Sequence, residues 1–169
     1  MEAKKIIITG AATRIGAVIA KSLANFDVKI LLHYNKSFSE VKKLKIDLEN
    51  LGAEIFLIKA NLNKSIEVKK IIPYAYKAMQ GIDCLINNAS LFENDNIEKF
   101  DDAKFDKHIS INLKSPSILS RDFFKYIKKN SGNIINIIDQ RIFKLTPHFF
   151  SYTLSKTGLG TLTKVSAMK

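Results

Sequence analysis

Five short apolar runs alternate with longer amphipathic stretches, and this alternation constrains the fold more than any other feature of the sequence. The runs are continuous and rich in isoleucine, as expected of strands buried on both faces. They cover residues 5–9, 28–33, 54–59, 84–87 and 133–138. The alternation predicts an α/β fold: a parallel sheet with helices on both faces, in a doubly wound, Rossmann-like order.

The amphipathic stretches predict five helices. Two sets of apolar residues each fall on one helical face: Ile15, Ile19, Leu23 and Phe26, and then Val41, Leu44, Leu48 and Leu51. A third helix is expected over about residues 65–79, kinked or broken by Pro73. A fourth is expected over about residues 105–128, with Pro116 inside its span, and a fifth begins near residue 151.

The length suits one domain with a sizeable core, but the chain ends while a helical pattern is still running. The five predicted strands also fall short of the roughly six or more of a dinucleotide-binding fold. We therefore expect residues 1–169 to form a single domain that is incomplete at its C-terminus.

The composition limits where the protein can be located and which kinds of site it can contain. Hydrophobic residues make up 46% of the chain, but the longest apolar runs are far shorter than a membrane span, and no signal peptide is visible. We therefore expect a cytoplasmic protein that contacts no membrane. The lone Cys84 excludes an intrachain disulfide and a cysteine zinc cluster, so we expect a buried thiol and no metal site.

The formal net charge of +11 leaves two kinds of partner open. Nucleic acid is one, because basic surfaces bind phosphates. The lysines, however, are spread over the whole chain, and no single helix concentrates them with aromatic residues as a base-stacking surface does. We therefore expect a small anionic ligand and no nucleic acid.

The first turn, TGAATRIG at residues 9–16, has features of a phosphate-binding loop. Backbone N–H groups and the N-terminus of the following helix hold phosphate at such a turn. Gly10 would allow the tight turn, and Gly16 would let the helix pack close to the strand. Ala12 and Ile15 stand where the G-x-G-x-x-G fingerprint has glycine, so this turn alone is not diagnostic.

The end of the second strand favours a phosphorylated dinucleotide. A fold that binds NAD usually carries Asp or Glu there, to accept from the ribose hydroxyls. The sequence HYNKS at residues 33–37 contains no acid. Lys36, Ser37 and a neutral or charged His33 suit a 2′-phosphate, and Arg14 lies at the neighbouring turn. We predict NADP(H) over NAD(H); the alternative is a merely solvated strand end.

The sequence SYTLSK at residues 151–156 places Tyr152 and Lys156 on one helical face. A lysine beside a phenol lowers its pKa, which predicts Tyr152 as a proton donor that works nearer neutral pH. The pattern Y-x-x-x-K often occurs by chance, so alone it does not indicate a catalytic pair. It is supported here by the phosphate turn, by NNA at residues 87–89 after the fourth strand, and by Asn112 in the fourth helix.

These motifs, in this order, resemble those of the short-chain dehydrogenase/reductase family over the whole chain. Residues 9–16 look like T-G-x-x-x-G-x-G, and residues 87–90 look like N-N-A-G. Asn112, Tyr152 and Lys156 match the family's catalytic Asn, Tyr and Lys. The resemblance implies an NADP(H)-binding reductase domain and, for the full-length protein, a homotetramer.

Three departures from the family pattern resemble one branch, the pteridine reductases. Asp139 stands where the family usually has Ser, Arg14 replaces the middle glycine of the turn, and Ser90 replaces the glycine of N-N-A-G. That branch reads T-G-x-x-x-R-x-G, uses Asp with Tyr and Lys, and carries H-Y-x-x-S after the second strand. HYNKS at residues 33–37 matches this last signature.

The resemblance assigns roles to residues of this sequence. The implied catalytic residues are Asn112, Asp139, Tyr152 and Lys156. The implied cofactor-binding residues are Gly10, Arg14, Ile15, Gly16, His33, Tyr34, Lys36, Ser37, Asn61, Leu62, Asn88, Ala89, Tyr152 and Lys156. The implied substrate-binding residues are Arg14, Ser90, Phe92, Asp139 and Tyr152, with Phe92 over the pterin ring.

Some roles stay open. Asn112 is expected to anchor either a water or the local backbone. Arg141 either contacts the substrate or is a surface charge. His148 is expected in a loop near the mouth of the pocket. Phe149 and Phe150 are expected to pack rather than to bind a ligand.

The leading prediction is an NADPH-dependent reductase that transfers a hydride to the C=N bond of a dihydropterin, of the dihydrobiopterin, dihydromonapterin or dihydrofolate type. Asp139 beside Tyr152 would orient the tyrosine and relay the proton that the nitrogen needs. The alternatives are a carbonyl or 3-oxoacyl-thioester reductase of the same family and a protein that binds NADP(H) without turnover. Asp139 in place of Ser speaks against the first, and the intact catalytic set against the second.

Overall fold

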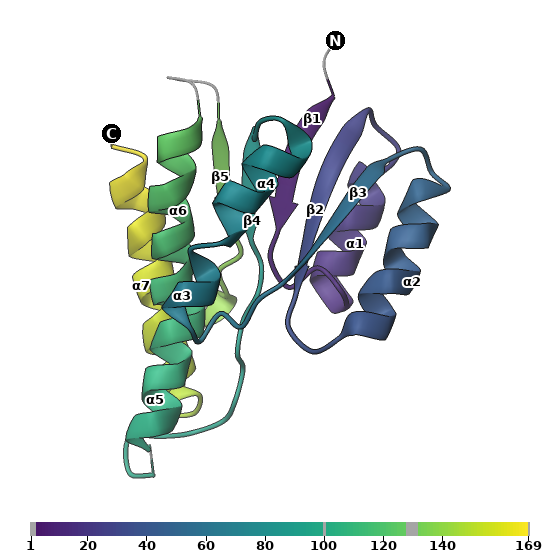
Figure 1. The fold of residues 1–169 in the computed structure, drawn as a ribbon. Helices are drawn as coiled ribbons and strands as arrows, with labels where there is room; N and C mark the ends of the chain where they lie inside the picture. The colour runs from purple at the N-terminus through teal and green to yellow at the C-terminus, as the bar shows by residue number, and fades with distance from the viewer. Residues whose placement is uncertain (1–2, 100, 128–131, 169) are drawn as a thin grey trace.

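The computed structural model of the protein describes residues 3–99, 101–127 and 132–168. Its centre is a parallel sheet with the strand order β3-β2-β1-β4-β5 (Figure 1). The strands are Lys4–Ile8 (β1), Val28–Tyr34 (β2), Glu54–Lys59 (β3), Cys84–Asn87 (β4) and Asn133–Asn136 (β5). The predicted doubly wound, Rossmann-like α/β fold is confirmed.

Helices cover both faces of the sheet (Figure 1). They are α1 (Arg14–Leu23), α2 (Phe38–Glu49), α3 (Ser65–Val68), α4 (Ile71–Met79), α5 (Asp102–Ile109), the π-helical turn η1 (Ser110–Lys114), α6 (Ser115–Tyr126), the short 3₁₀ helix η2 (Gln140–Ile142) and α7 (Phe150–Ser166).

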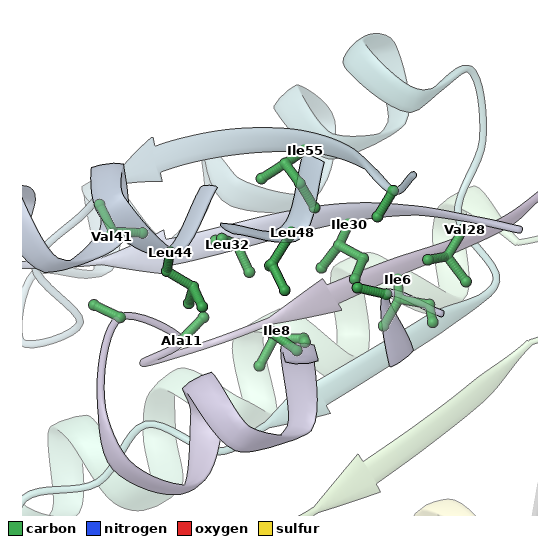
Figure 2. Close-up of a cluster of buried hydrophobic side chains, with 14 of the residues drawn as sticks. Ile6, Ile8, Ala11, Val28, Ile30, Leu32, Val41, Leu44, Leu48 and Ile55 are labelled. Carbon is green, nitrogen blue, oxygen red and sulfur yellow. The ribbon is translucent and has the colours of Figure 1, made fainter. Parts of the chain in front are cut away.

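Alternate residues of the central strands point to opposite faces, which explains why the strand runs are apolar throughout. In β2, Ile30 and Leu32 pack with residues of α1 and α2 (Figure 2), whereas Leu31 packs on the other face with residues of α4 and α6. All three side chains are fully buried. Burial of a side chain of this size stabilises the fold by about 1.5–3 kcal/mol, so the sheet is fixed from both sides.

The third predicted helix is divided, and the division does not lie at the proline. It forms as α3 and α4, which are separated at Lys69 and Lys70. Pro73 belongs to the first turn of α4. N–H groups of a first turn have no partner within the helix, so the proline removes no hydrogen bond there.

The fourth predicted helix forms as α5, η1 and α6 in succession. Pro116 lies at the start of α6, and the wider η1 turn precedes it. The N–H of Ser115 donates to the carbonyl of Ser110, five residues back, as in a π turn. This turn lets the chain continue in one direction through a residue that has no N–H. The predicted end at Lys128 lies outside the described residues.

Three apolar residues expected on buried helix faces are exposed instead: Ile15 is 60% exposed, Phe26 66% and Leu51 50%. Phe26 and Leu51 lie beyond the ends of α1 and α2, so the spacing of a helix does not determine which way their side chains point. Ile15 lies in the first turn of α1 and lines the cleft described below. The fifth strand is also shorter than predicted and ends at Asn136.

Candidate active site

A cleft of about 790 Å³ opens at the carboxyl ends of the strands. The strand order reverses between β1 and β4, and parallel sheets bind ligands in the crevice at such a switch point. Most of the predicted site residues line it: Gly10, Arg14, Ile15, His33, Lys36, Asn61, Leu62, Asn88, Ala89, Ser90, Phe92, Asp139 and Tyr152. The predicted site residues outside the lining are Gly16, Tyr34, Ser37, Asn112 and Lys156.

Glycine shapes the first turn at two points. Gly10 has a φ of 61°, and a Cβ there would lie 2.9 Å from the Cα of Ala89. A Cβ at Gly16 would collide with the carbonyl oxygen of Gly10 and lie 2.7 Å from Nδ2 of Asn88. Only glycine therefore lets α1 begin this close to β1. The arrangement leaves the backbone and the N-terminus of α1 accessible to an anion.

Arg14 keeps the backbone conformation expected of the glycine that it replaces. Its φ is 51°, in the left-handed region. That region costs a non-glycine residue about 1–2 kcal/mol. The side chain is exposed and lines the cleft, so the strained backbone places a guanidinium beside the N-terminus of α1. Strain of this kind is typical of ligand sites.

Asn88 joins the turns that follow β1 and β4. Its Nδ2 donates to the carbonyl oxygens of Thr9 (2.9 Å) and Gly10 (3.1 Å). In return, Oγ1 of Thr9 accepts from the backbone N–H groups of Asn88 and Ala89, both at 3.0 Å. These bonds hold the two loops side by side at the point where the strand order reverses.

His33 connects the ends of three strands and is neutral. Its Nδ1 accepts from the backbone N–H of Gly10 at 3.1 Å. The other nitrogen, Nε2, therefore carries the proton and donates to the carbonyl oxygen of Ala60 at 3.0 Å. Burial lowers the pKa of His33 to about 4, although the bond to Ala60 opposes this shift. Of the two charge states predicted, only the neutral one fits, and His33 holds the turn rather than offering a cation.

Lys36 is the exposed cation that the end of β2 presents to the cleft, next to Asn35. Tyr34 and Ser37 do not share this position. Tyr34 is 9% exposed, and its ring packs on Phe38 with 5.9 Å between the ring centroids. Ser37 is the residue that immediately precedes α2. Tyr34 thus supports the strand end instead of presenting its ring to the cleft.

Tyr152 and Asp139 meet at one end of the cleft. The Tyr152 hydroxyl donates to Oδ2 of Asp139 at 2.8 Å, and Oδ1 accepts from the N–H of Arg141 at 2.8 Å. Burial by itself raises the pKa of Asp139. The two hydrogen bonds and the charges of Arg141 and Lys156 outweigh burial, so the pKa lies below its usual 3.8. Asp139 is therefore an ionised carboxylate at neutral pH.

The pKa of Tyr152 is raised, which corrects the direction predicted from the sequence. Burial raises it, and the hydrogen bond and charge of Asp139 raise it further. Lys156 does not reverse the shift, because its Nζ donates to the carbonyl oxygen of Ile137 at 2.7 Å and lies 5.8 Å from the Tyr152 ring centroid. Burial lowers the pKa of Lys156 to about 8, against the attraction of Asp139.

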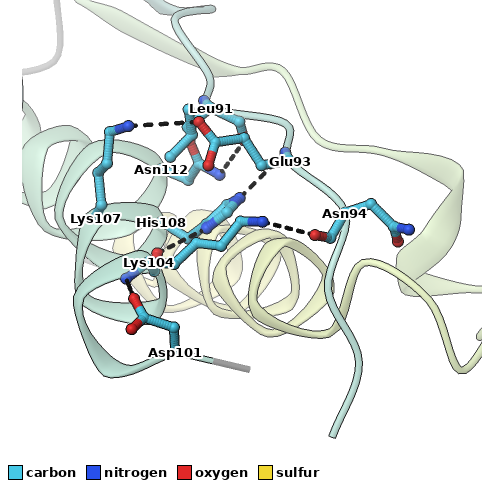
Figure 3. A network of polar contacts seen from close by, with 8 residues as sticks. All are labelled: Leu91, Glu93, Asn94, Asp101, Lys104, Lys107, His108 and Asn112. Carbon is cyan, nitrogen blue, oxygen red and sulfur yellow. Dashed lines mark hydrogen bonds and ion pairs between the residues drawn. The ribbon is translucent and has the colours of Figure 1, made fainter. Parts of the chain in front are cut away.

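Asn112 anchors the loop that follows β4 (Figure 3). Its side chain is fully buried in η1. Oδ1 accepts from the N–H of Leu91 at 2.7 Å, and Nδ2 donates to the carbonyl oxygen of Leu91 at 2.9 Å and to Oγ of Ser155 at 3.0 Å. Of the two roles predicted for Asn112, the structure shows the anchoring of the local backbone.

An aromatic wall bounds the cleft beside Tyr152. Phe92 lines the cleft and stacks on Phe149, with 4.3 Å between centroids and 3° between ring planes. Tyr152 meets Phe92 edge-on at 4.7 Å. Cζ of Arg141 lies 4.5 Å from the Phe149 centroid and 5.6 Å from that of Phe92. Phe149 therefore packs, as predicted, and Arg141 is a cation–π partner of the wall. His148, in the preceding loop, is exposed.

Several lining residues were not predicted: Thr13, Asn35, Asn63, Leu91, Lys107 and Ile111. The first four adjoin predicted residues in the sequence, so their place just after a strand could have identified them. Lys107 and Ile111 come from α5 and η1, far from any strand end. Only tertiary packing brings these two to the cleft, and no sequence motif marks them.

Over residues 3–99, 101–127 and 132–168, no group of three or more His, Cys, Asp or Glu side chains is placed to hold a metal ion. Across the same ranges, the helices are too short or too polar for one to cross a membrane.

The sheet order, the glycine turn after β1 and the cleft at the switch point are those of a dinucleotide-binding α/β fold. The chain belongs to the short chain dehydrogenase family, whose sequence pattern matches residues 4–169.

Two curated relatives illustrate the range of the family. The chain is 29% identical over 164 residues to an uncharacterized oxidoreductase of Thermotoga maritima, a match that covers 96% of this chain and 64% of that protein. It is 28% identical over 165 residues to the 3-oxoacyl-[acyl-carrier-protein] reductase FabG of Staphylococcus epidermidis, covering 97% of this chain and 68% of that one.

Solved structures add a more similar relative. FolM alternative dihydrofolate reductase 1 from Brucella canis, complexed with NADP, is 36% identical with a TM-score of 0.91, over 96% of this chain and 66% of that one. A short chain dehydrogenase from Burkholderia cenocepacia, in complex with NADP, has a TM-score of 0.94 over 99% of this chain and 68% of that one. At 23% identity, the latter bears on the fold alone. The chain thus spans 64% of the Thermotoga protein and 66% of the Brucella one.

Proposed function

We propose that the protein is an NADPH-dependent oxidoreductase that reduces a dihydropterin, of the dihydrobiopterin, dihydromonapterin or dihydrofolate type, by hydride transfer to a C=N bond. The observation that carries the proposal is the 2.8 Å hydrogen bond from Tyr152 to Asp139, in a cleft bounded by Phe92. The 36% identity to the Brucella canis dihydrofolate reductase supports the same substrate class.

The residues of the cleft fit NADP(H). A Cβ at Gly10 or Gly16 would fill the space in which a pyrophosphate approaches the backbone and the N-terminus of α1. Arg14 and Lys36 are both exposed and line the cleft. Lys36 follows the second strand, near the position where NAD-binding folds usually carry an acid. These two cations suit a 2′-phosphate. The NADP in the Brucella canis structure supports this choice.

Bound NADPH supplies the hydride, and Tyr152 supplies the proton. The nitrogen of a C=N bond becomes a strong base once its carbon has received the hydride, so a donor with a raised pKa can protonate it. Tyr152 holds its proton, which it donates to Asp139, until that acceptor forms; the hydroxyl then turns its proton from Asp139 to the nitrogen. The product gains one C–H and one N–H bond. Lys156 lies beside this pair: its Nζ is 5.8 Å from the Tyr152 ring centroid and donates to the carbonyl oxygen of Ile137.

Asp139 also favours a pterin over a ketone. Its carboxylate is ionised and can accept hydrogen bonds from the amino and amide N–H groups of a pterin edge. A developing oxyanion requires donors, and a carboxylate in the same place would repel it. Phe92 offers a flat apolar surface for a fused ring, and Arg14 and Ser90 line the same cleft.

A second candidate is the reduction of a 3-oxoacyl thioester, which the similarity to FabG of Staphylococcus epidermidis favours. The two candidates are separated by following NADPH oxidation with dihydrobiopterin, dihydromonapterin, dihydrofolate and a 3-oxoacyl thioester in parallel, with NADH as the control cofactor. We expect turnover with a dihydropterin and a preference for NADPH. Turnover of the thioester alone would establish the second candidate. NADPH binding without any turnover would indicate a non-catalytic protein.

We also propose that the full-length protein is a cytoplasmic homotetramer with residues 1–169 as one NADP(H)-binding domain, as membership of the family suggests. Analytical ultracentrifugation tests the assembly, and a monomer at micromolar concentration would contradict it.

A further inference from the structure

The loop after β4 is held to α5 and η1 at Leu91 and at Glu93 (Figure 3), the two residues that flank Phe92 in the sequence. On one side, Asn112 binds the N–H and the carbonyl of Leu91. On the other side, the backbone N–H of Glu93 donates to Nε2 of His108 at 3.3 Å. Phe92 lies between these two anchored residues, and its ring is 51% exposed and lines the cleft.

The contacts of His108 fix its proton. Nδ1 lies 2.9 Å from the carbonyl oxygen of Lys104. A carbonyl oxygen only accepts, so Nδ1 carries the proton and Nε2 presents the lone pair that accepts from Glu93. The His108 side chain is 0% exposed. Removal of the imidazole therefore takes away an acceptor that is itself shielded from water.

Two lysines reach the same stretch of loop through contacts that are exposed to solvent. Lys104 Nζ donates to the carbonyl oxygen of Asn94 at 2.7 Å, and Lys107 Nζ lies 3.4 Å from Oε1 of Glu93. Contacts at the surface contribute little, because water competes for both partners. The imidazole of His108 is shielded from water and the two lysine contacts are exposed, so the bond of His108 contributes more to the position of the loop than these two contacts do.

We propose that His108 is a positioning residue that sets the substrate end of the cleft through the backbone of Glu93. It does not line the cleft, so it acts on Phe92 through the loop and not on a ligand. The edge-on contact between Phe92 and Tyr152, at 4.7 Å, makes the position of this ring matter for the site. The inference rests on the proposed function in that Phe92 is taken to stack on the substrate ring.

Loss of this anchor should affect substrate binding more than cofactor binding. We expect His108→Leu to raise KM for a dihydropterin about tenfold, with the dissociation constant of NADPH changed less than about twofold. In His108→Gln the amide oxygen can accept from Glu93, so part of the loss should be recovered. Lys42→Leu is the control, because Lys42 is exposed on α2 and does not line the cleft, and it should behave as wild type.

A second readout needs no turnover. Hydrogen–deuterium exchange of the Glu93 amide, resolved by NMR, should become at least about tenfold faster in His108→Leu, while the Leu91 amide bound to Asn112 keeps its protection. An unchanged exchange rate of the Glu93 amide in His108→Leu would overturn the inference. So would losses of NADPH affinity and of stability as large as the loss of dihydropterin binding. If the wild type reduces no dihydropterin, the proposed function fails, and Glu93 exchange still decides the role of His108.

Discussion

At the scale of single residues, Arg14 carries backbone strain, with a φ of 51° at the mouth of the anion-binding turn. Arg14→Gly relieves that strain but adds freedom to the unfolded chain, so we expect the free energy of unfolding to rise by up to about 1 kcal/mol. NADPH affinity should fall about tenfold, because a charge-assisted contact is lost. Urea unfolding and NADPH titration measure the two effects.

Gln80 offers the matched control for Arg14. It is also left-handed, with a φ of 59°, but it flanks the C-terminal end of α4 and does not line the cleft. Gln80→Gly should change stability in the same direction and leave NADPH affinity unchanged. If Arg14→Gly binds NADPH as tightly as the wild type does, the guanidinium makes no contact with the cofactor. If only the pterin KM changes, the arginine serves the substrate.

Tyr152→Phe removes the proposed donor and keeps the ring that packs on Phe92. We expect kcat to fall by about 10²–10⁴, the usual contribution of a positioned acid, with NADPH binding nearly intact. Steady-state kinetics and NADPH titration provide the measurement. Tyr74→Phe, on α4 and partly exposed, is the control. A rate near that of the wild type in Tyr152→Phe would show that another group donates the proton.

The sequence predicted which residues meet at the catalytic end, but not their electrostatics. The order of the motifs predicted Asp139 and Tyr152 as partners, and the Tyr152 hydroxyl lies 2.8 Å from Oδ2 of Asp139. The predicted lowering of the Tyr152 pKa required the Lys156 ammonium to act on the phenol. In the fold that ammonium donates to the carbonyl oxygen of Ile137 instead. Spacing along a helix defines a shared face, whereas hydrogen-bond partners come from other elements of the fold.

At the scale of elements, the packing of α1 on β1 depends on Gly16. We expect Gly16→Ala to destabilise the protein by about 2–3 kcal/mol and to weaken NADPH binding, because the new methyl meets backbone atoms of the turn. Gly160→Ala is the control within a helix. Its nearest neighbour would be the Ile142 side chain at 3.4 Å, so we expect no loss, or a gain of about 0.5–1 kcal/mol. Thermal unfolding compares them; equal losses would contradict the account of the turn.

His33 links the turn after β1 to the end of β3, and this link should depend on pH. Its pKa is about 4 in the fold and 6.5 as its usual value, so between these values the unfolded chain binds a proton that the folded chain excludes. Stability contributed by neutral His33 is present above pH 6.5 and is lost as the pH falls towards 4. We expect a loss of about 2 kcal/mol between pH 7 and 5.

Urea unfolding of the wild type and of His33→Gln over that range measures this contribution, because the glutamine does not titrate. The stability of the variant should depend less steeply on pH. Equal slopes in the two proteins would mean that His33 is not held neutral by the fold.

Element types were more predictable than element ends. The strand runs were recognisable because both faces of the sheet are buried. The ends of helices were not: Phe26 and Leu51 continue an apolar period beyond α1 and α2 and are exposed. The π-helical turn at Asn112 has no signature in the sequence apart from Pro116. The spacing of apolar residues indicates which face of a helix is buried. It does not indicate where the helix ends, because a helix end depends on local backbone hydrogen bonds.

At the scale of the whole molecule, the parallel sheet brings distant segments to one edge. The turn at Gly10, the strand end at His33 and the pair formed by Asp139 and Tyr152 all border one cleft. Alternation of strands and helices was sufficient to predict this edge, since carboxyl ends of parallel strands lie together. Lys107, Ile111 and His108 could not be predicted, because they reach the site only through the packing of α5 and η1 against the loop after β4.

The proposed reaction is hydride transfer from NADPH to carbon of a dihydropterin, with Tyr152 giving the proton to nitrogen. The most direct test incubates the protein with dihydrobiopterin and NADPH that carries two deuterium atoms at C4 of the nicotinamide, followed by mass spectrometry of the product. We expect a tetrahydropterin with one carbon-bound deuterium, and almost none from Tyr152→Phe. A tetrahydropterin without deuterium, or deuterium found only in a reduced 3-oxoacyl thioester supplied alongside, would contradict the account.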